Sequence, residues 1–197
     1  MVKQERAART RESLVRAAAE VFAEEGFAVA SVAAISERAG VTPGALHFHF
    51  DGKDALARAV EERAVEVVRG ITGAGGDPLR ALVGSTYALV ALLGDDVVVR
   101  AGFVLGADLA HRSRVDLRAQ WRRWAEESLG SAARAGLLAE GVPAPDAARL
   151  VVAATVGLED LDPLGPGGDA PHALTRIWSV ILPGIAAPRT QETDWMV

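Results

Sequence analysis

One stretch of the chain, SVAAISERAGVTPGALHFHFDGK from Ser31 to Lys53, constrains the fold more than any other. Ser31 suits the N-cap of a short helix, and Gly40 can take the left-handed conformation that closes it. Thr42 and Pro43 then supply a second N-cap with proline at the first helical position. The pattern therefore predicts two short helices joined by a turn of about three residues, as in a helix-turn-helix.

The second of these helices is expected to be short, from Pro43 to His47. Val41 is expected to be buried in the turn, and Phe48 and Phe50 to act as apolar anchors after the helix. The turn alone fits an ordinary helical hairpin in an all-helical core equally well. The neighbouring residues decide between the two interpretations.

These neighbouring residues resemble the N-terminal domain of the TetR family of bacterial repressors. Members carry a helix ending in F-x-x-x-G-F/Y, then T/S-x-x-x-I-A-x-x-A-G-V-T/S-x-G-x-L/I-Y-x-H-F-x-x-K. The positions of this chain that agree with the pattern are Phe22, Gly26, Phe27, Ser31, Ile35, Ala39, Gly40, Val41, Thr42, Gly44, Leu46, His49, Phe50 and Lys53. Agreement at so many fixed spacings is far more specific than a short motif, so it favours the helix-turn-helix.

Composition limits the other classes of protein. The chain has 197 residues, half of them hydrophobic, which is enough for the core of one or two domains. It has no cysteine, and no apolar run approaches the roughly 18 residues of a membrane span. We therefore expect an intracellular, cytoplasmic protein without disulfides and without a membrane segment.

The net charge of -5 would by itself argue against nucleic-acid binding. The charges are unevenly distributed, however, because the N-terminal end is basic, with Lys3, Arg6, Arg9, Arg11 and Arg16. This basic end precedes the helix-turn-helix. Arginines at a helix start are usually just solvated, and contact with DNA phosphate is the alternative.

Helical periodicity runs through the rest of the chain, and no alternating strand pattern occurs. The expected helices span residues 10–25, 53–71, 79–93, 97–109, 113 or 114 to 138, 146–161 and 172–182. Thr72 to Asp77 and Asp162 to Pro171 are expected to be a linker and a loop. The predicted fold class is all-α, with a DNA-binding helix-turn-helix domain over residues 1–54 and a helical ligand-binding and dimerisation domain over residues 55–197.

The resemblance implies that the first three helices bind double-stranded operator DNA and that the last two long helices pair in a homodimer. The residues at the family's DNA-contacting positions are Thr42, Pro43, Gly44, His47, Phe48, His49 and Lys53. Two of them depart from the family pattern: His47 stands where tyrosine is usual, and Pro43 where a lysine or other polar residue is common. The start of the helix at Lys53 is also a possible phosphate site, since it carries exposed amides and a positive charge.

Several later segments, among them VVVRAGFVLGAD and VVAATVGLED, resemble the gamma-butyrolactone receptor-like repressors of actinomycetes. In that branch a tryptophan stacks on the small-molecule signal and a threonine bonds its polar end, and these correspond to Trp121 and Thr155. Tyr87, Phe103 and Leu105 are expected to complete an apolar pocket. The alternative is that Trp121 and Thr155 are packed core, with Thr155 bonded back to its own helix.

Rival functions have weaker support. His47 and His49 could be a metal pair, but no third ligand is near in the sequence. Ser131, His111 and Asp108 lie in helical stretches without a nucleophile elbow, so neither catalysis nor a cofactor is predicted. The sequence predicts a ligand-responsive repressor released by a lactone-, furan- or butenolide-like signal or by an antibiotic. A signal-binding sink or corepressor with weak operator binding is the alternative.

Overall fold

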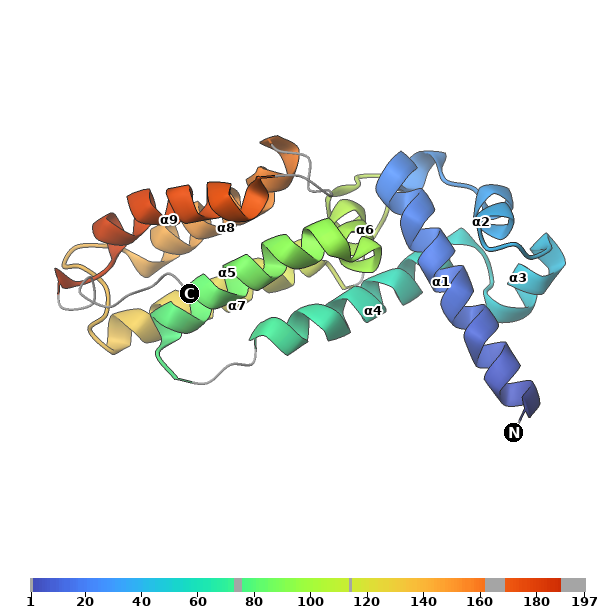
Figure 1. Cartoon of the computed structure of the whole chain (residues 1–197), viewed down its shortest axis with the longest axis horizontal. Coiled ribbons are helices and arrows are strands. Elements are labelled where there is room, and N and C mark those ends of the chain that lie inside the picture. The colour runs from blue at the N-terminus through green and yellow to red at the C-terminus, as the bar shows by residue number, and fades with distance from the viewer. Residues whose placement is uncertain (1, 73–75, 114, 162–168, 189–197) are drawn as a thin grey trace. The chain divides into compact units, whose positions relative to one another are not determined.

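The computed structural model of the chain describes residues 2–72, 76–113, 115–161 and 169–188. The helices in these ranges are α1 (Val2–Val29), α2 (Val32–Arg38), α3 (Pro43–His49), α4 (Lys53–Thr72), α5 (Pro78–Asp95), α6 (Val97–Ala107), α7 (Leu117–Arg134), α8 (Ala144–Leu161) and α9 (Ala170–Ile185) (Figure 1). The same ranges contain no strand, and only an isolated bridge joins Leu138 to Ala186. The predicted all-α fold class is confirmed.

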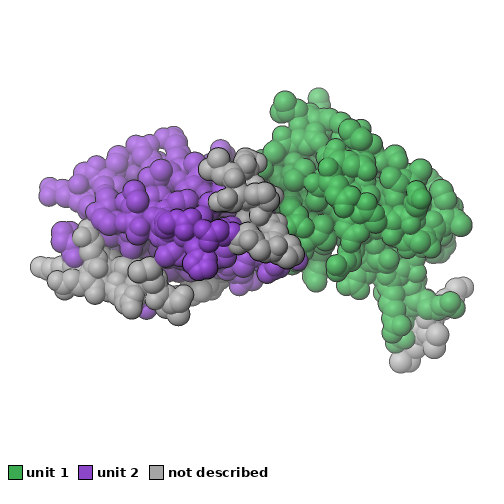
Figure 2. Space-filling model, turned by 45° about the horizontal axis from the view of Figure 1, so that its top comes forward, with its two compact units in different colours: residues 1–67, 96–118 green, residues 68–95, 119–197 purple. Residues whose placement is uncertain are grey.

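The chain divides into two compact units (Figure 2). Unit 1 comprises residues 1–67 and 96–118, and unit 2 comprises residues 68–95 and 119–197. This division differs from the boundary expected after residue 54, because α6 packs against α1 and so belongs to the unit that holds the helix-turn-helix. The functional boundary at residue 54 stays a prediction.

The core of unit 1 forms around α1. The side chains predicted to line one face of this helix are all buried, namely Leu14, Val15, Ala18, Val21 and Phe22. They pack with Ile35 of α2, Leu46 of α3 and Leu56 of α4. α1 begins at Val2 rather than at the predicted Thr10, because residues 2–9 contain no proline or glycine and are rich in good helix formers.

α1 is broken near its end, as the glycine in its sequence predicts. Gly26 has φ 73° and ψ 171°, a conformation that is essentially restricted to glycine, and the helix resumes through Val29 after it. The break leaves the backbone N–H of Phe27 without its helical acceptor.

Unit 2 is built from α5, α8 and α9, which pack against one another, and from the buried face of α7. Two neutral hydrogen bonds join α5 to α9: Trp178 Nε1 donates to Thr86 Oγ1 at 2.8 Å, and Tyr87 Oη donates to Thr175 Oγ1 at 3.1 Å. Each such bond adds about 1 kcal/mol to stability. No helix among the described residues is long and apolar enough to cross a membrane.

Several helix ends in unit 2 differ from the prediction for local reasons. α7 ends at Arg134 rather than Leu138, because Gly136 has φ 69° and the Leu137 N–H donates back to Ala132 O at 2.9 Å. α9 extends past the predicted end at Leu182 and includes Pro183. Parts of the predicted linker and loop, residues 73–75 and 162–168, lie outside the described residues.

Candidate nucleic-acid interface and signal site

Short-range contacts fix α2 and the turn that follows it. Ser31 Oγ accepts a hydrogen bond from the Ala34 N–H at 3.1 Å, which confirms Ser31 as the N-cap. Gly40 has φ 66° and the Val41 N–H donates to Ser36 O at 3.0 Å, so the turn closes as predicted. Val41 itself is half-buried rather than buried.

α3 is capped and anchored so that one face stays in solvent. Thr42 Oγ1 accepts from the Ala45 N–H at 3.2 Å, and Pro43 occupies the first turn. Leu46 is fully buried beneath the helix. The helix continues to His49, beyond the predicted end at His47, because the next glycine, Gly52, lies only after it.

The exposed face of α3 carries most of the residues expected to contact DNA. Thr42, Pro43, Gly44, His47 and Phe48 are exposed, and His49 is half-buried. A Cβ atom added at Gly44 would meet nothing within 4 Å, so the start of the helix is open to close approach. The contacts themselves stay a prediction.

The two phenylalanines at the end of α3 have different environments. Phe50 is buried, and the guanidinium carbon of Arg11 lies 4.9 Å from its ring centroid. Phe48 is 82% exposed, so the expectation that it anchors the helix is wrong. A large apolar side chain held this far into water fits contact with a partner, and the thymine methyl group in the major groove is apolar.

Lys53 has an environment that differs from the expected one. Its ammonium group donates to Phe27 O at 2.7 Å and to Ala30 O at 2.9 Å. It also lies 4.4 Å from the centroid of the Phe27 ring. In this arrangement the ammonium group contacts carbonyl groups of the α1–α2 connection, and a phosphate contact by Lys53 stays a prediction.

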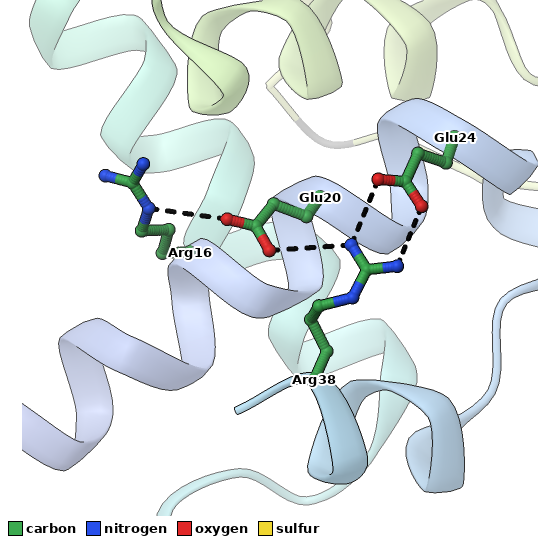
Figure 3. Close-up of polar contacts among 4 residues, drawn as sticks. All are labelled: Arg16, Glu20, Glu24 and Arg38. Carbon is green, nitrogen blue, oxygen red and sulfur yellow. Dashed lines mark hydrogen bonds and ion pairs between the residues drawn. The ribbon is translucent and has the colours of Figure 1, made fainter. Parts of the chain in front are cut away.

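A surface ion-pair network joins α2 to α1 and was not identified from the sequence. Figure 3 shows Arg38 of α2 facing Glu20 and Glu24 of α1, with bidentate contacts to Glu24 at 2.8 and 3.0 Å and a contact to Glu20 at 3.5 Å. The hydrogen bond from Arg38 lowers the pKa of Glu24. The spacing of the two glutamates on one face of α1 was the available sequence signal.

The sequence-based metal alternative gains no support from the structure. Within the described ranges, histidine, cysteine, aspartate and glutamate side chains form no group of three or more that could hold a metal ion. His47 is exposed and His49 packs edge-on against Phe48, with the ring centroids 5.2 Å apart.

Trp121 and Thr155, the two residues expected to bind a signal, contact each other. Trp121 is 1% exposed, and its Nε1 lies 3.4 Å from Thr155 Oγ1. Thr155 in turn donates to Val151 O at 2.7 Å on its own helix, as the core interpretation expects. The Trp124 ring is tilted against Trp121 at a centroid distance of 4.8 Å. The two residues thus form a closed, neutral polar contact inside unit 2.

The other expected pocket residues do not join this pair in a described cavity. Tyr87 is half-buried in unit 2 and bonded to Thr175, whereas Phe103 and Leu105 are fully buried in unit 1. Two open hollows of about 390 and 330 Å³ occur in unit 2, and the residues that line them are different ones. The composition of the signal pocket stays a prediction.

Ala64 of α4 is packed tightly against Gly102 of α6. A Cβ atom added at Gly102 of α6 would lie 2.7 Å from the Ala64 Cβ of α4. The two backbones therefore approach closely only because both residues are small. A larger polar side chain at position 64 would not fit beside Gly102 in this conformation.

Known proteins resemble the chain over nearly its whole length. Residues 14–60 match the family described as bacterial regulatory proteins, tetR family. The A-factor receptor protein of Streptomyces griseus is 30% identical over 189 residues, which cover 95% of this chain and 68% of the relative.

Two solved structures share the fold. One is a gamma-butyrolactone receptor described as ArpA-like, with a TM-score of 0.83 and 28% identity over 95% of this chain and 93% of that chain. The other is CprB from Streptomyces coelicolor in complex with its biological operator sequence, with a TM-score of 0.82 and 30% identity over 94% and 93% of the two chains. These relatives are regulators and not enzymes.

Proposed function

This chain belongs to the TetR family of bacterial transcriptional regulators, and we propose that it is a repressor whose hold on operator DNA is released by a small-molecule signal. The exposed face of α3 carries the proposal. A helix that is capped at Thr42 and anchored by Leu46, yet leaves His47 and Phe48 in solvent, is presented to a partner instead of the core. The complex of its relative CprB with an operator sequence supports operator DNA as the partner.

We infer that the chain acts as a homodimer in the cytoplasm, where its DNA target lies. α8 and α9 each leave a large apolar side chain in solvent, Leu150 at 48% and Val180 at 78% exposure. A second copy would cover such groups and place two short recognition helices on symmetric half-sites. Sedimentation equilibrium should give twice the mass of the chain. A monomer at all concentrations would contradict this assembly.

The signal is proposed to be a small amphipathic molecule, such as a lactone, furan or butenolide, or an antibiotic. Trp121 offers an apolar ring, and Thr155 offers a hydroxyl that already accepts a hydrogen bond from the indole. A ligand carbonyl or hydroxyl could replace that bond while the ring covers its apolar part. The names of the relatives, an A-factor receptor and a gamma-butyrolactone receptor, support this class of ligand.

Release requires that signal binding and DNA binding be coupled. α4 begins beside the helix-turn-helix and continues into unit 2, so a shift of this helix on signal binding would move the recognition helices. A coupling free energy of about 1–3 kcal/mol would reduce operator occupancy substantially.

The test is a selection of bound sites from random DNA by the purified chain, followed by a gel shift at moderate salt. Specific sites should emerge, and extracts of the source organism should release them. Trp121→Ala should leave operator binding intact and abolish release. Loss of both activities in that variant would make Trp121 a structural residue instead.

The second candidate function is a signal-binding sink or corepressor with weak operator binding. Two observations favour this alternative. Pro43 presents an apolar ring at a position where a polar, base-contacting side chain is common in the family, and Lys53 donates to a backbone carbonyl of Phe27. A chain that selects no DNA sites but still binds the signal would support this alternative.

A further inference from the structure

Both backbone polar groups of Phe27 are held by charged side chains from other parts of unit 1. The Phe27 N–H, freed by the break at Gly26, donates to Asp108 Oδ2 at 2.8 Å. The Phe27 carbonyl accepts from Lys53 Nζ at 2.7 Å. Asp108 is the C-cap residue of α6, and Lys53 is the first residue of α4. One peptide segment at the end of α1 is thus held by two other helices.

The Phe27 ring contacts Lys53 and His111. Lys53 Nζ is 4.4 Å from its centroid, and the His111 ring is 4.6 Å away. Phe27 is 8% exposed, so these contacts are shielded from water. A cation close to an aromatic face adds attraction that rises with desolvation. Movement of Phe27 would disturb its ring contacts and both of its backbone hydrogen bonds together.

A buried contact between His111 and Glu61 links the end of α6 to α4. His111 follows Asp108 in the turn after α6, and its N–H donates to Asp108 O at 3.1 Å. His111 Nε2 lies 3.3 Å from Oε1 of Glu61, and the two side chains are 3% and 1% exposed. Glu61 is on α4, the helix that begins with Lys53. These contacts link five residues, which we call the Phe27 clamp: Phe27, Asp108, His111, Glu61 and Lys53.

The clamp ends directly at the helix-turn-helix. Lys53 also donates to Ala30 O at 2.9 Å, and Ala30 precedes Ser31, the N-cap of α2. The direction in which the chain enters α2 is thereby fixed by the start of α4. Hydrogen bonds from the Ala110 and Phe27 N–H groups lower the pKa of Asp108, and nearby His111 adds to this, while burial opposes it. Asp108 accordingly holds Phe27 as a carboxylate at neutral pH.

We propose that Asp108 and Lys53, acting through Phe27, are positioning residues for operator binding. The clamp links the end of α1 to the start of α4 and to the end of α6. Figure 1 shows the ribbons of these three helices within unit 1. This inference rests on the proposed function, because it assigns the residues that orient the recognition helix without contacting DNA. A shift at the end of α6 would reach α2 and α3 through Asp108, independently of any tilt of α4.

The test compares full-length Asp108→Ala with Asp108→Asn, which keeps one of the two acceptor oxygens that bind the Phe27 and Ala110 N–H groups. The control is Asp95→Ala, which removes an exposed carboxylate at the end of α5. The DNA probe is the operator that the wild-type chain selects. Well below the unfolding temperature, Asp108→Ala should bind it about tenfold more weakly, as expected for a lost charge-assisted hydrogen bond.

Asp108→Asn should bind with an affinity between those of Asp108→Ala and wild type, since its single amide oxygen can accept from the Phe27 N–H only while the amide nitrogen faces the Ala110 N–H. The dependence of affinity on salt should be unchanged in both variants, because no phosphate contact is removed. In the absence of DNA, backbone hydrogen exchange over residues 27–50 should be faster in Asp108→Ala than in wild type or Asp108→Asn. A purely structural role would lower the unfolding temperature without changing affinity in the folded state.

The outcomes separate this inference from the proposed function. If wild type selects no operator, the proposed repressor function fails, and the clamp is then tested by hydrogen exchange over residues 27–50 alone. An exchange rate in Asp108→Ala equal to that of wild type would overturn the clamp. If wild type binds its operator and Asp108→Ala binds equally well, the positioning role is overturned while the repressor stands.

Discussion

The two units of this chain use different chemistry to hold their helices together. In unit 1 charged side chains bind backbone groups of distant residues: Asp108 and Lys53 both bind Phe27. In unit 2 several contacts between helices are neutral, and they join an indole, a phenol or a serine hydroxyl to a threonine hydroxyl or a backbone carbonyl. Charged contacts depend on pH and are costly to break once buried, whereas neutral ones are weaker and tolerate an apolar ligand.

This difference matches the tasks proposed for the units. A DNA-binding element must keep a fixed geometry, and charge-assisted hydrogen bonds to the backbone enforce direction as well as distance. A site for a small amphipathic signal must exchange one neutral contact for another at low cost. The Trp121–Thr155 contact at 3.4 Å is a weak bond of this kind.

The largest expected effect comes from removing a buried side chain at the Glu61–His111 contact of unit 1. Glu61→Ala would remove the fully buried side chain that faces His111 and leave a cavity, so we expect a loss of about 2–5 kcal/mol in the free energy of unfolding. Urea unfolding followed by circular dichroism measures it. Glu61→Gln, which keeps the shape, should lose less. A loss of stability smaller than that of Trp178→Phe in unit 2 would contradict the contrast between the units.

The close approach of α4 and α6 gives the next effect. In Gly102→Ala the new Cβ would lie 2.7 Å from Ala64 Cβ, so overpacking should destabilise the chain by about 1–3 kcal/mol. The matched control is Gly84→Ala on α5 in unit 2, where nothing lies within 4 Å. That substitution should stabilise the chain by about 0.5–1 kcal/mol. If the two substitutions shifted the unfolding temperature in the same direction, the packing explanation would be refuted.

A neutral contact of unit 2 should matter less. Trp178→Phe removes the hydrogen bond from Nε1 to Thr86 Oγ1, while Thr86 still donates to Val83 O at 2.6 Å. We expect a loss of about 1–2 kcal/mol in thermal unfolding, with no change between pH 5 and pH 8. A pH-dependent loss would show that charged groups govern this unit as well.

Acid should weaken unit 1 through Asp108. Its pKa is lowered in the folded state, so its contribution to stability is present above its unfolded pKa of about 3.9 and is lost as pH falls through the folded value. Asp108→Asn should therefore lose less stability than wild type between pH 5 and pH 3. Parallel acid unfolding curves for the two proteins would contradict this assignment.

The smallest effect is expected at the surface network of Figure 3. Arg38→Gln removes the contacts to Glu20 and Glu24, which are exposed to solvent. A slightly lower unfolding temperature at low salt should disappear at about 1 M salt, where the Debye length is about 3 Å. A difference that persists at high salt would point to a packing role for the Arg38 side chain.

Features set by neighbouring residues were predictable from the sequence. Ser31, Gly40 and Thr42 fix the helix ends within three or four residues of themselves, so the helix-turn-helix followed from local chemistry. The buried face of α1 followed from its helical spacing. The missed helix ends, such as Arg134 of α7, depended on a glycine conformation that many positions in a sequence could supply.

Contacts between distant residues could not be predicted in the same way. Lys53 meets a carbonyl 26 residues earlier in the chain, and Asp108 meets an N–H 81 residues away. A lysine at a helix start is equally consistent with a phosphate ligand, because only the packed fold brings the carbonyl groups of Phe27 and Ala30 beside Lys53. Trp121 and Thr155 were both singled out, but their contact with each other depends on how α7 and α8 pack.

The arrangement of aromatic residues has a spectroscopic consequence. The first 118 residues contain no tryptophan, whereas Trp121 and Trp124 are in contact in α7 and Trp178 lies in the core of unit 2; the fourth, Trp195, lies outside the described residues. In a Trp195→Phe variant, intrinsic tryptophan emission should thus report on unit 2 and stay silent on the helix-turn-helix. Phe48→Trp would add a fluorophore at the solvent-facing end of α3, so docking on DNA and events around Trp121 could be followed in separate experiments on the same chain.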